Sequence, residues 1–136
     1  MNTETMTAKE FAAKLGNDVA NLLGWLECTA TAVDSTGGGC TATRVDFTDT
    51  NRSCSLVMID ENMAALDGES VARMYDGDDH RDGEWVGVAV YNGNDWREQG
   101  TDYTGTDLMT DRPFRDYALL VNHCADVLRD WEKVTR

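Results

Sequence analysis

The densest group of side chains suited to chemistry is the run Asp78-Asp79-His80-Arg81-Asp82-Gly83-Glu84, in which four carboxylates surround a histidine. Carboxylate and imidazole donors at such close spacing are typical of metal sites. A calcium loop of the EF-hand type needs acidic or amide residues at positions one, three and five, Gly at six and Glu at twelve. Counted from Asp78, position six is Gly83, but position three is His80 and position twelve is Ala89. The closing ligand is absent, and we predict a solvated acidic loop without a metal.

The only other histidine, His123, precedes Cys124. A cysteine and a histidine act as nucleophile and base only when their side chains are within hydrogen-bond reach. Neighbours on a helix point about 100° apart, and Cys124 falls on an apolar stripe, so we expect it in the core. No serine lies in a nucleophile elbow, and no carboxylate has an apolar setting that would tune it for acid–base work. We predict that the protein is not an enzyme and holds no cofactor.

The four cysteines follow none of the spacings used for zinc or redox chemistry. Cys28, Cys40, Cys54 and Cys124 lie 12, 14 and 70 residues apart, without a CxxC pair. We interpret them as reduced thiols of a cytoplasmic protein, with a Cys28–Cys40 disulfide as the alternative. The first ten residues have no basic segment followed by an apolar one, and no apolar run approaches the roughly 20 residues that span a bilayer. We expect no secretory signal and no membrane association.

The charge is the strongest compositional feature, at −13 for 136 residues, and it is uneven. Residues 111–136 hold five acids and five bases, so the whole excess lies in residues 1–110. Residues 76–107 alone carry nine acids against Arg81 and Arg97. Such a field repels nucleic acid and anionic membranes and steers basic partners towards it. We therefore predict no direct nucleic acid binding and a partner with a basic surface.

The acidic region has the composition of a protein-binding surface, because the aromatic residues Trp85, Tyr91, Trp96 and Tyr103 interleave with its acids. Duplex DNA carries one charge per roughly 1.7 Å, so 13 charges correspond to about 22 Å of duplex. A domain of this length has a radius of gyration of about 14 Å, which is large enough to display them on one face. We predict a contact surface formed by residues Asp76, Asp78, Asp79, Asp82, Glu84, Asp95, Trp96, Glu98 and Asp102.

In size and charge the chain resembles the small acidic inhibitors that phages and plasmids carry against restriction or CRISPR systems, although it shares no motif with them. The resulting hypothesis is an inhibitor that imitates nucleic acid on a nucleic-acid-handling machine, in the cytoplasm of a host cell. The alternative is a structural or assembly component, or an escort protein similar to secretion chaperones, whose acidity serves solubility. A homodimer is compatible with either hypothesis.

Two amphipathic helices are expected at the two ends of the sequence. Thr7 and Glu10 form a capping box, Phe11 starts an apolar stripe that runs to about Trp25, and Gly24 suits a left-handed cap. The second helix spans 110–136, with Asp111 and Pro113 in its first turn. Its apolar stripe consists of Phe114, Tyr117, Leu120, Val121, Cys124, Val127, Leu128, Trp131 and Val134.

Between the helices we expect strands. Residues 29–33, 41–48, 54–59 and 84–91 have the alternation and the β-branched content of strands. Residues 35–39 are expected to form a loop, and its three glycines have no phosphate-binding pattern. Asn92-Gly93 predicts a tight hairpin whose returning strand is 96–99, followed by a loop over 100–107. Residues 60–75 are ambiguous: we favour a helix in which Met63 and Leu66 face inward, with a strand over residues 70–75 as the alternative. The sequence thus predicts one α+β domain, with an antiparallel sheet of about four to five strands packed against the terminal helices.

Overall fold

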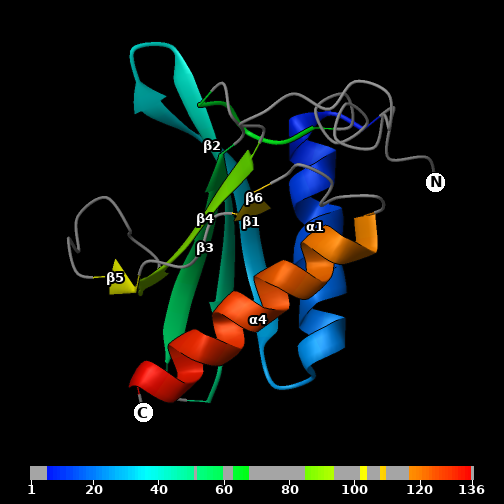
Figure 1. Cartoon of the computed structure of the whole chain (residues 1–136), viewed down its shortest axis with the longest axis vertical. Coiled ribbons are helices and arrows are strands. Elements are labelled where there is room, and N and C mark those ends of the chain that lie inside the picture. Colours follow the sequence, from blue (N-terminus) through cyan, green and yellow to red (C-terminus); the bar gives the residue numbers. More distant parts are fainter. Residues whose placement is uncertain are drawn as a thin grey trace.

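The computed structural model describes residues 6–50, 52–59, 63–67, 85–93, 102–103, 108–109 and 117–135. Its elements are α1 (Ala8–Leu23), β1 (Glu27–Gly37), β2 (Cys40–Thr48), β3 (Ser53–Ile59), β4 (Trp85–Asn92), β5 (Asp102–Tyr103), β6 (Leu108–Met109) and α4 (Tyr117–Thr135). The four long strands form an antiparallel sheet in the order β1-β2-β3-β4, and the two short strands both pair with β4 (Figure 1). The α+β prediction with two terminal helices on an antiparallel sheet is confirmed.

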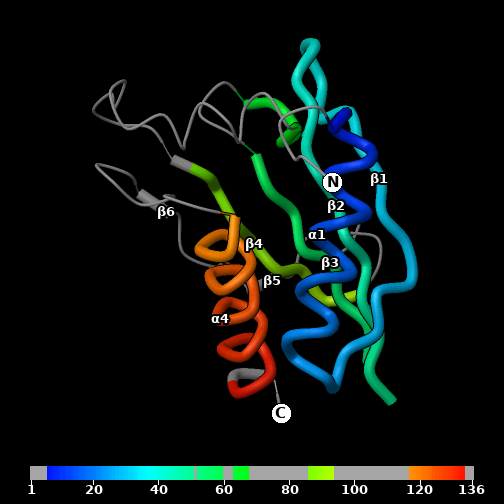
Figure 2. The backbone as a smooth tube through the Cα atoms, turned by 90° about the vertical axis from the view of Figure 1, so that its right-hand side faces the viewer, coloured from blue at the N-terminus to red at the C-terminus, as the bar shows by residue number. Residues whose placement is uncertain are grey.

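Both helices cover the same face of the sheet. Gly16 of α1 packs directly on Cys28 and Val45 of the first hairpin, whereas Cys124 of α4 contacts Met58 of β3. In Figure 2, α1 accordingly runs along β1 and β2, and α4 runs along β4. The core between helices and sheet contains the fully buried side chains of Phe11, Leu15, Val19, Val45, Phe47, Leu56, Met58, Leu66, Leu120, Leu128 and Trp131.

The start of α1 forms as the sequence predicts. Thr7 Oγ1 accepts a hydrogen bond from the Glu10 N–H at 3.2 Å, and Glu10 Oε1 accepts one from the Thr7 N–H at 3.0 Å. This hydrogen bonding lowers the pKa of Glu10, because a carboxylate that accepts N–H donors prefers its charged form. At the other end Gly24 adopts a φ of 79°, and its N–H donates to the Ala20 carbonyl. The capping box and the glycine cap are both confirmed.

The two helices are tied together by an aromatic contact near the start of α4. Phe11 and Tyr117 meet edge to face with ring centroids 5.8 Å apart, and Lys14 Nζ lies 4.8 Å from the Tyr117 ring centre. The predicted apolar stripe of α4 is buried at Leu120, Val121, Cys124, Val127, Leu128 and Trp131, and Tyr117 is half-buried. The predicted helix start at Asp111 and Pro113 lies outside the described residues.

The first hairpin is tighter than predicted. Residues 35–37, expected in a loop, belong to β1, and Gly37 pairs with Cys40. Only Gly38 and Gly39 form the turn, with φ angles of 60° and 82°. Two consecutive positive φ angles are what a type I′ turn needs, and its twist matches the flanking strands. Glycine is therefore used here for backbone conformation.

Residues 63–67 correct the helix predicted over 60–75. Met63 has a φ of 60°, which excludes a helix at that position, and its side chain is exposed instead of facing inward. Thr41 explains the difference, since its N–H donates to the Met63 carbonyl and its hydroxyl accepts from the Ala65 N–H. Leu66 is fully buried, as predicted, but in a non-helical segment whose N–H groups at Ala65 and Leu66 donate to Thr41 and Thr43 of β2. Residues 60–62 and 68–75 lie outside the described part.

The hairpin predicted at Asn92-Gly93 is also wrong. A two-residue turn there would place Tyr91 opposite residue 94, but Tyr91 pairs with Asp102 of β5. The Asn92 side chain accepts a hydrogen bond from the Trp131 indole at 2.8 Å, and the Gly93 N–H donates to the Ser53 carbonyl at 2.8 Å. The local turn signal is thus overridden by contacts with α4 and β3. The expected returning strand at 96–99 lies outside the described residues.

Candidate functional site

The structure places one of the nine predicted contact residues. Asp102 lies on β5, opposite Tyr91 of β4. The other eight lie outside the described residues, namely Asp76, Asp78, Asp79, Asp82, Glu84, Asp95, Trp96 and Glu98. The structure does show where two acidic segments, residues 60–84 and 94–101, join the described helices and strands, which form the framework of the protein.

Both acidic segments are attached to β4, the last long strand of the sheet. The connection from β3 to β4 leaves at Ile59 and returns at Trp85, at one end of the sheet, because Ile59 pairs with Gly87. The second segment begins after Gly93, at the opposite end of β4, and returns at Asp102. Residues 60–84 contain nine acids, the described Asp67 among them, and two bases, so this connection alone has a net charge of −7.

The described framework is much less acidic than the rest of the chain. Its residues include eleven acids and six bases, a net charge of −5, and the other segments carry the remaining −8 of the total −13. Four of the six bases form ion pairs within this framework. The pairs are Lys14–Asp18, Arg44 with Asp34 and Asp46, Arg52–Asp49, and Arg129–Asp126. The charge excess is therefore concentrated outside the framework.

A polar cluster that the sequence analysis missed lies on the sheet face opposite the helices. Arg44 on β2 reaches Asp34 Oδ2 at 3.1 Å and Asp46 Oδ1 at 3.4 Å, and the buried Ser55 hydroxyl donates to Asp46 Oδ1 at 2.7 Å. The Arg44 Nε atom is buried without a hydrogen bond, so its contact with Asp46 is electrostatic only. Arg44 and Asp46 are two residues apart on a strand, so their side chains lie on the same face of the sheet. This spacing could have indicated the ion pair from the sequence. The cluster joins β1, β2 and β3.

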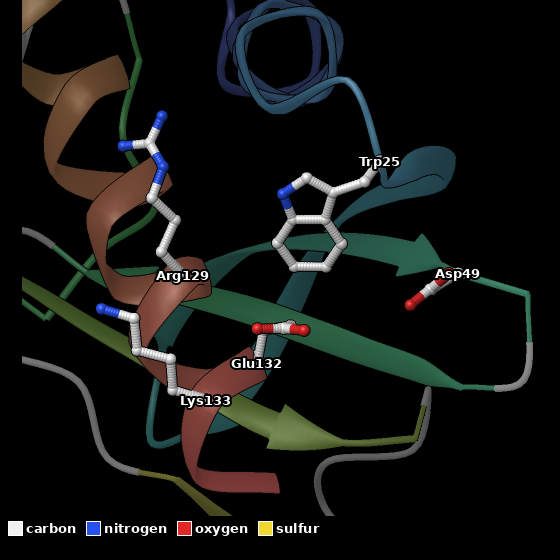
Figure 3. A pocket seen from close by; sticks show the side chains of 5 residues that line it. All are labelled: Trp25, Asp49, Arg129, Glu132 and Lys133. Atoms are coloured by element: carbon white, nitrogen blue, oxygen red, sulfur yellow. The ribbon is translucent and has the colours of Figure 1, made fainter. Parts of the chain in front are cut away.

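A pocket of about 380 Å³ opens at the end of the sheet where β2 turns into β3. Figure 3 shows Trp25, which follows α1, facing the last turns of α4, with Asp49 of the β2–β3 turn on the other side. The α4 residues are Arg129, Glu132 and Lys133. The sequence analysis singled out none of these as a site, because three chain segments meet here that no local pattern connects.

The chemistry of the cysteines is that of core thiols. All four are free, and Cys28 pairs with Phe47 at the far end of the hairpin from Cys40, which rules out the alternative Cys28–Cys40 disulfide. Burial raises the pKa of Cys54 and of Cys124 to about 12. Cys124 Sγ lies 3.6 Å from Met58 Sδ in the core, so the prediction that it is a packing residue is confirmed.

Within the described ranges, no three His, Cys, Asp or Glu side chains gather closely enough to hold a metal ion. The run 78–84, considered above as a metal loop, is outside those ranges. Neither described helix is long and apolar enough to cross a membrane. No family model matches the chain, and neither the curated proteins nor the solved structures contain a match.

Proposed function

We propose that this protein is a small acidic inhibitor that acts in the cytoplasm by binding the basic surface of another protein, one that handles nucleic acid. The observation that carries the proposal is the separation of charge. The framework pairs most of its bases with acids, whereas the β3–β4 connection alone has a net charge of −7. If the acidity served solubility alone, the negative charge would not need to be concentrated in one connection. A local excess of carboxylates is suited to one basic partner surface.

The spacing of the attachment points supports imitation of a nucleic acid backbone. The two acidic segments leave β4 at its opposite ends, and eight residues of antiparallel strand extend over about 24 Å. One strand of duplex DNA carries about seven phosphates over that length. The predicted contact surface contains eight carboxylates. The number of charges therefore suits one nucleic acid strand.

The assignment of the surface is tested by removing three charges from it and comparing the result with the removal of three charges elsewhere. Asp78→Asn, Asp79→Asn and Asp82→Asn together take the net charge from −13 to −10. A matched control, Glu27→Gln, Asp126→Asn and Asp130→Asn, makes the same change at exposed framework positions. We expect only the first variant to dissociate faster from the captured partner, with an affinity about tenfold lower and a flatter salt dependence.

Equal losses in the two variants would contradict a specific contact surface, because binding would then follow net charge alone. The ion pair between Asp126 and Arg129 is solvent-exposed, so its removal in the control costs little stability. Unchanged circular dichroism and thermal midpoints in both variants verify that the framework is intact.

A further inference from the structure

The first strand, β1, is an open edge of the sheet. In the strand order β1-β2-β3-β4 it has β2 on one side, and no other described strand pairs with it on the other side. Figure 2 shows β1 at one margin of the sheet, with α1 running alongside it. With 11 residues it is also the longest of the described strands. Such an edge presents a row of N–H and C=O groups to which a further strand can be added.

The register shows which residues of β1 carry the outward groups. Thr41 of β2 donates its N–H to the Met63 carbonyl and therefore not to β1. Hydrogen-bonded and non-hydrogen-bonded positions alternate along an antiparallel pair. Ser35, opposite Thr41, is thus at a non-hydrogen-bonded position, and so are Val33 and Thr31. The N–H and C=O groups of Thr31 and Val33 therefore point away from β2, and neither residue makes another backbone hydrogen bond among the described residues.

The middle of β1 lacks the features that protect edge strands from pairing. Irregularities of the register flank residues 30–35, which themselves follow one regular register. Natural edges are commonly protected by Pro, by Lys or by a bulge. Residues 30–35 contain neither Pro nor Lys, and their one charged side chain, Asp34, is held by Arg44 at 3.1 Å. Val33 in this segment is 38 % exposed. This segment is therefore suited to pairing with another strand.

The charge distribution favours a second copy of this chain as the source of that strand. β2 and β3 separate β1 from β4, to which the acidic segments are attached. A basic partner is steered towards those segments, because opposite charges attract it there. Two copies that meet at β1 keep their acidic segments at the two outer margins of the combined sheet. Their mutual repulsion is smallest in this arrangement.

We propose that two copies of this chain pair antiparallel through β1, about a two-fold axis at Ala32. In this register Thr31 of each copy lies opposite Val33 of the other, and their outward groups form hydrogen bonds. Asp34 lies opposite Ala30 of the other copy, so no like charges face each other across the new pair. At the axis the two Cα atoms are about 4.5 Å apart, which suits a side chain as small as alanine. A two-fold contact of this kind closes after two chains.

The helices leave room for this contact. A Cβ added at Gly16 of α1 would touch Cys28 and Thr31 of β1 and Val45 of β2, so α1 lies above these two strands. Neighbouring strands are about 4.8 Å apart, and the α1 helices of the two copies would therefore be about 9.6 Å apart. Packed helices are separated by about 8–10 Å. The two α1 helices would thus come into contact without a clash.

A groove beside β1 accommodates the hairpin of the other copy. It has a volume of about 500 Å³ and lies between the last turns of α1 and the start of β1, where Asn21 and Glu27 contribute to its lining. With Ala32 at the axis, Gly37 of one copy comes next to Glu27 of the other. The turn at residues 38–39 consists of glycines, so it has no side chains that would keep it out of the groove. Figure 1 shows this hairpin projecting beyond the other strands.

The first test is the mass of the full chain in solution, measured by light scattering over a range of concentrations at low and at high salt. We expect the mass to rise with concentration to twice the 15.1 kDa of one chain. Dimers should form at lower concentration in high salt, because salt screens the repulsion between two chains of charge −13. This response is opposite to that expected for binding to a basic surface, so the two proposals fail independently.

Two results of this measurement would overturn the proposal. A single-chain mass at every concentration in high salt would leave the edge to a strand of another protein. Continued growth beyond two chains would contradict a contact that closes.

Val33→Lys tests whether β1 forms the contact. Lysine on an edge strand hinders pairing, and we expect the dimer dissociation constant to rise about tenfold or more. The matched control Met63→Lys changes another exposed apolar side chain, which lies off β1, and should leave the constant unchanged. Both substitutions take the net charge from −13 to −12, which reduces repulsion, so a loss in Val33→Lys alone cannot come from net charge. Equal constants in the two variants, with unchanged circular dichroism, would contradict the contact.

A disulfide tests the position of the axis. Ala32→Cys would place two thiols at a non-hydrogen-bonded pair, whose Cα separation of about 4.5 Å is within the range of disulfides. The control Ala30→Cys changes the same face of β1, but its two Cα atoms would be about 14 Å apart. Under mild oxidation we expect more covalent dimer than in wild type for Ala32→Cys only. Equal cross-linking of the two variants, or no excess over wild type in Ala32→Cys, would contradict an axis at Ala32.

Discussion

Individual side chains in this protein are governed more by burial than by sequence motif. Cys124 and Met58 meet at 3.6 Å between α4 and β3, where both side chains are buried in the core. Burial raises the pKa of Cys124 and of Cys54 to about 12, and it also raises the pKa of the half-buried Cys28. These thiols are therefore protonated and shielded at neutral pH, which is the behaviour of core residues.

Alkylation measures this shielding directly. Iodoacetamide at pH 8, with peptide mass spectrometry, should leave Cys54 and Cys124 unmodified in the folded protein and modify both in urea, since only the thiolate reacts. The half-buried Cys40 provides the internal control for reagent access. Labelling of Cys124 in the native state at the rate seen in urea would contradict its placement in the core.

The same pKa shifts predict how stability depends on alkaline pH. The two thiols titrate near 9.0 when unfolded and near 12 when folded, so ionisation favours the unfolded chain in between. Their contribution to stability is complete below pH 9 and is lost as pH rises from 9 towards 12. Urea midpoints should therefore fall above pH 9. The decline should be shallower in a Cys54→Ala, Cys124→Ala double variant, and an identical decline would exclude the thiols as its cause.

At the level of elements, the position of α1 depends on a glycine. A Cβ added at Gly16 would lie 2.8 Å from both Cys28 Sγ and Val45 Cγ1, and 3.3 Å from Thr31 Cγ2. The absence of a side chain lets the helix approach β1 and β2 closely. From sequence alone this glycine looks like a weak point in the helix.

Gly16→Ala separates helix propensity from packing. Alanine gains about 1 kcal/mol of propensity, but overpacking a tight contact costs about 1–3 kcal/mol. We expect a net loss of about 1 kcal/mol in urea unfolding. Asn17→Ala, at the adjacent exposed position, is the matched control and should be neutral or slightly stabilising. A stabilised Gly16→Ala protein would show that α1 does not rest on the sheet at this point.

Local patterns predicted the elements whose causes are local. The capping box at Thr7 and Glu10, the apolar stripe of α4 and the alternation of β4 all form as their residues indicate. Prediction failed where a distant group intervenes. Thr41 holds the segment around Met63 against β2 in place of a helix, and the Trp131 indole engages Asn92 where a tight turn was expected. Such partners are far away in the sequence, so a pattern that covers only a few residues does not include them.

The candidate sites also differ in whether their cause is local in the sequence or depends on distant segments. The acidic region was found from composition, because charge needs no knowledge of the fold, and its attachment to both ends of β4 became visible only in the sheet register. The pocket at Trp25 and the Asp34–Arg44–Asp46 cluster are assembled from separate segments. Neither has a sequence signature beyond the spacing of Arg44 and Asp46.

The whole molecule consists of a framework and the segments attached to it. A framework with paired charges supports acidic segments that leave both ends of β4, and a small aromatic pocket lies at the β2–β3 end. We propose that the acidic segments occupy a basic, nucleic-acid-binding surface of another protein. That claim predicts a salt-dependent interaction for which DNA competes.

The most direct measurement is capture of binding proteins from host lysate on the immobilised full chain, at low and at high salt and with added duplex DNA. We expect recovery of a nucleic-acid-handling protein that is lost at high salt, is displaced by DNA, and is recovered poorly by the variant with Asp78, Asp79 and Asp82 replaced by Asn. Capture of an apolar client that ignores salt, or only of further copies of this chain, would contradict it.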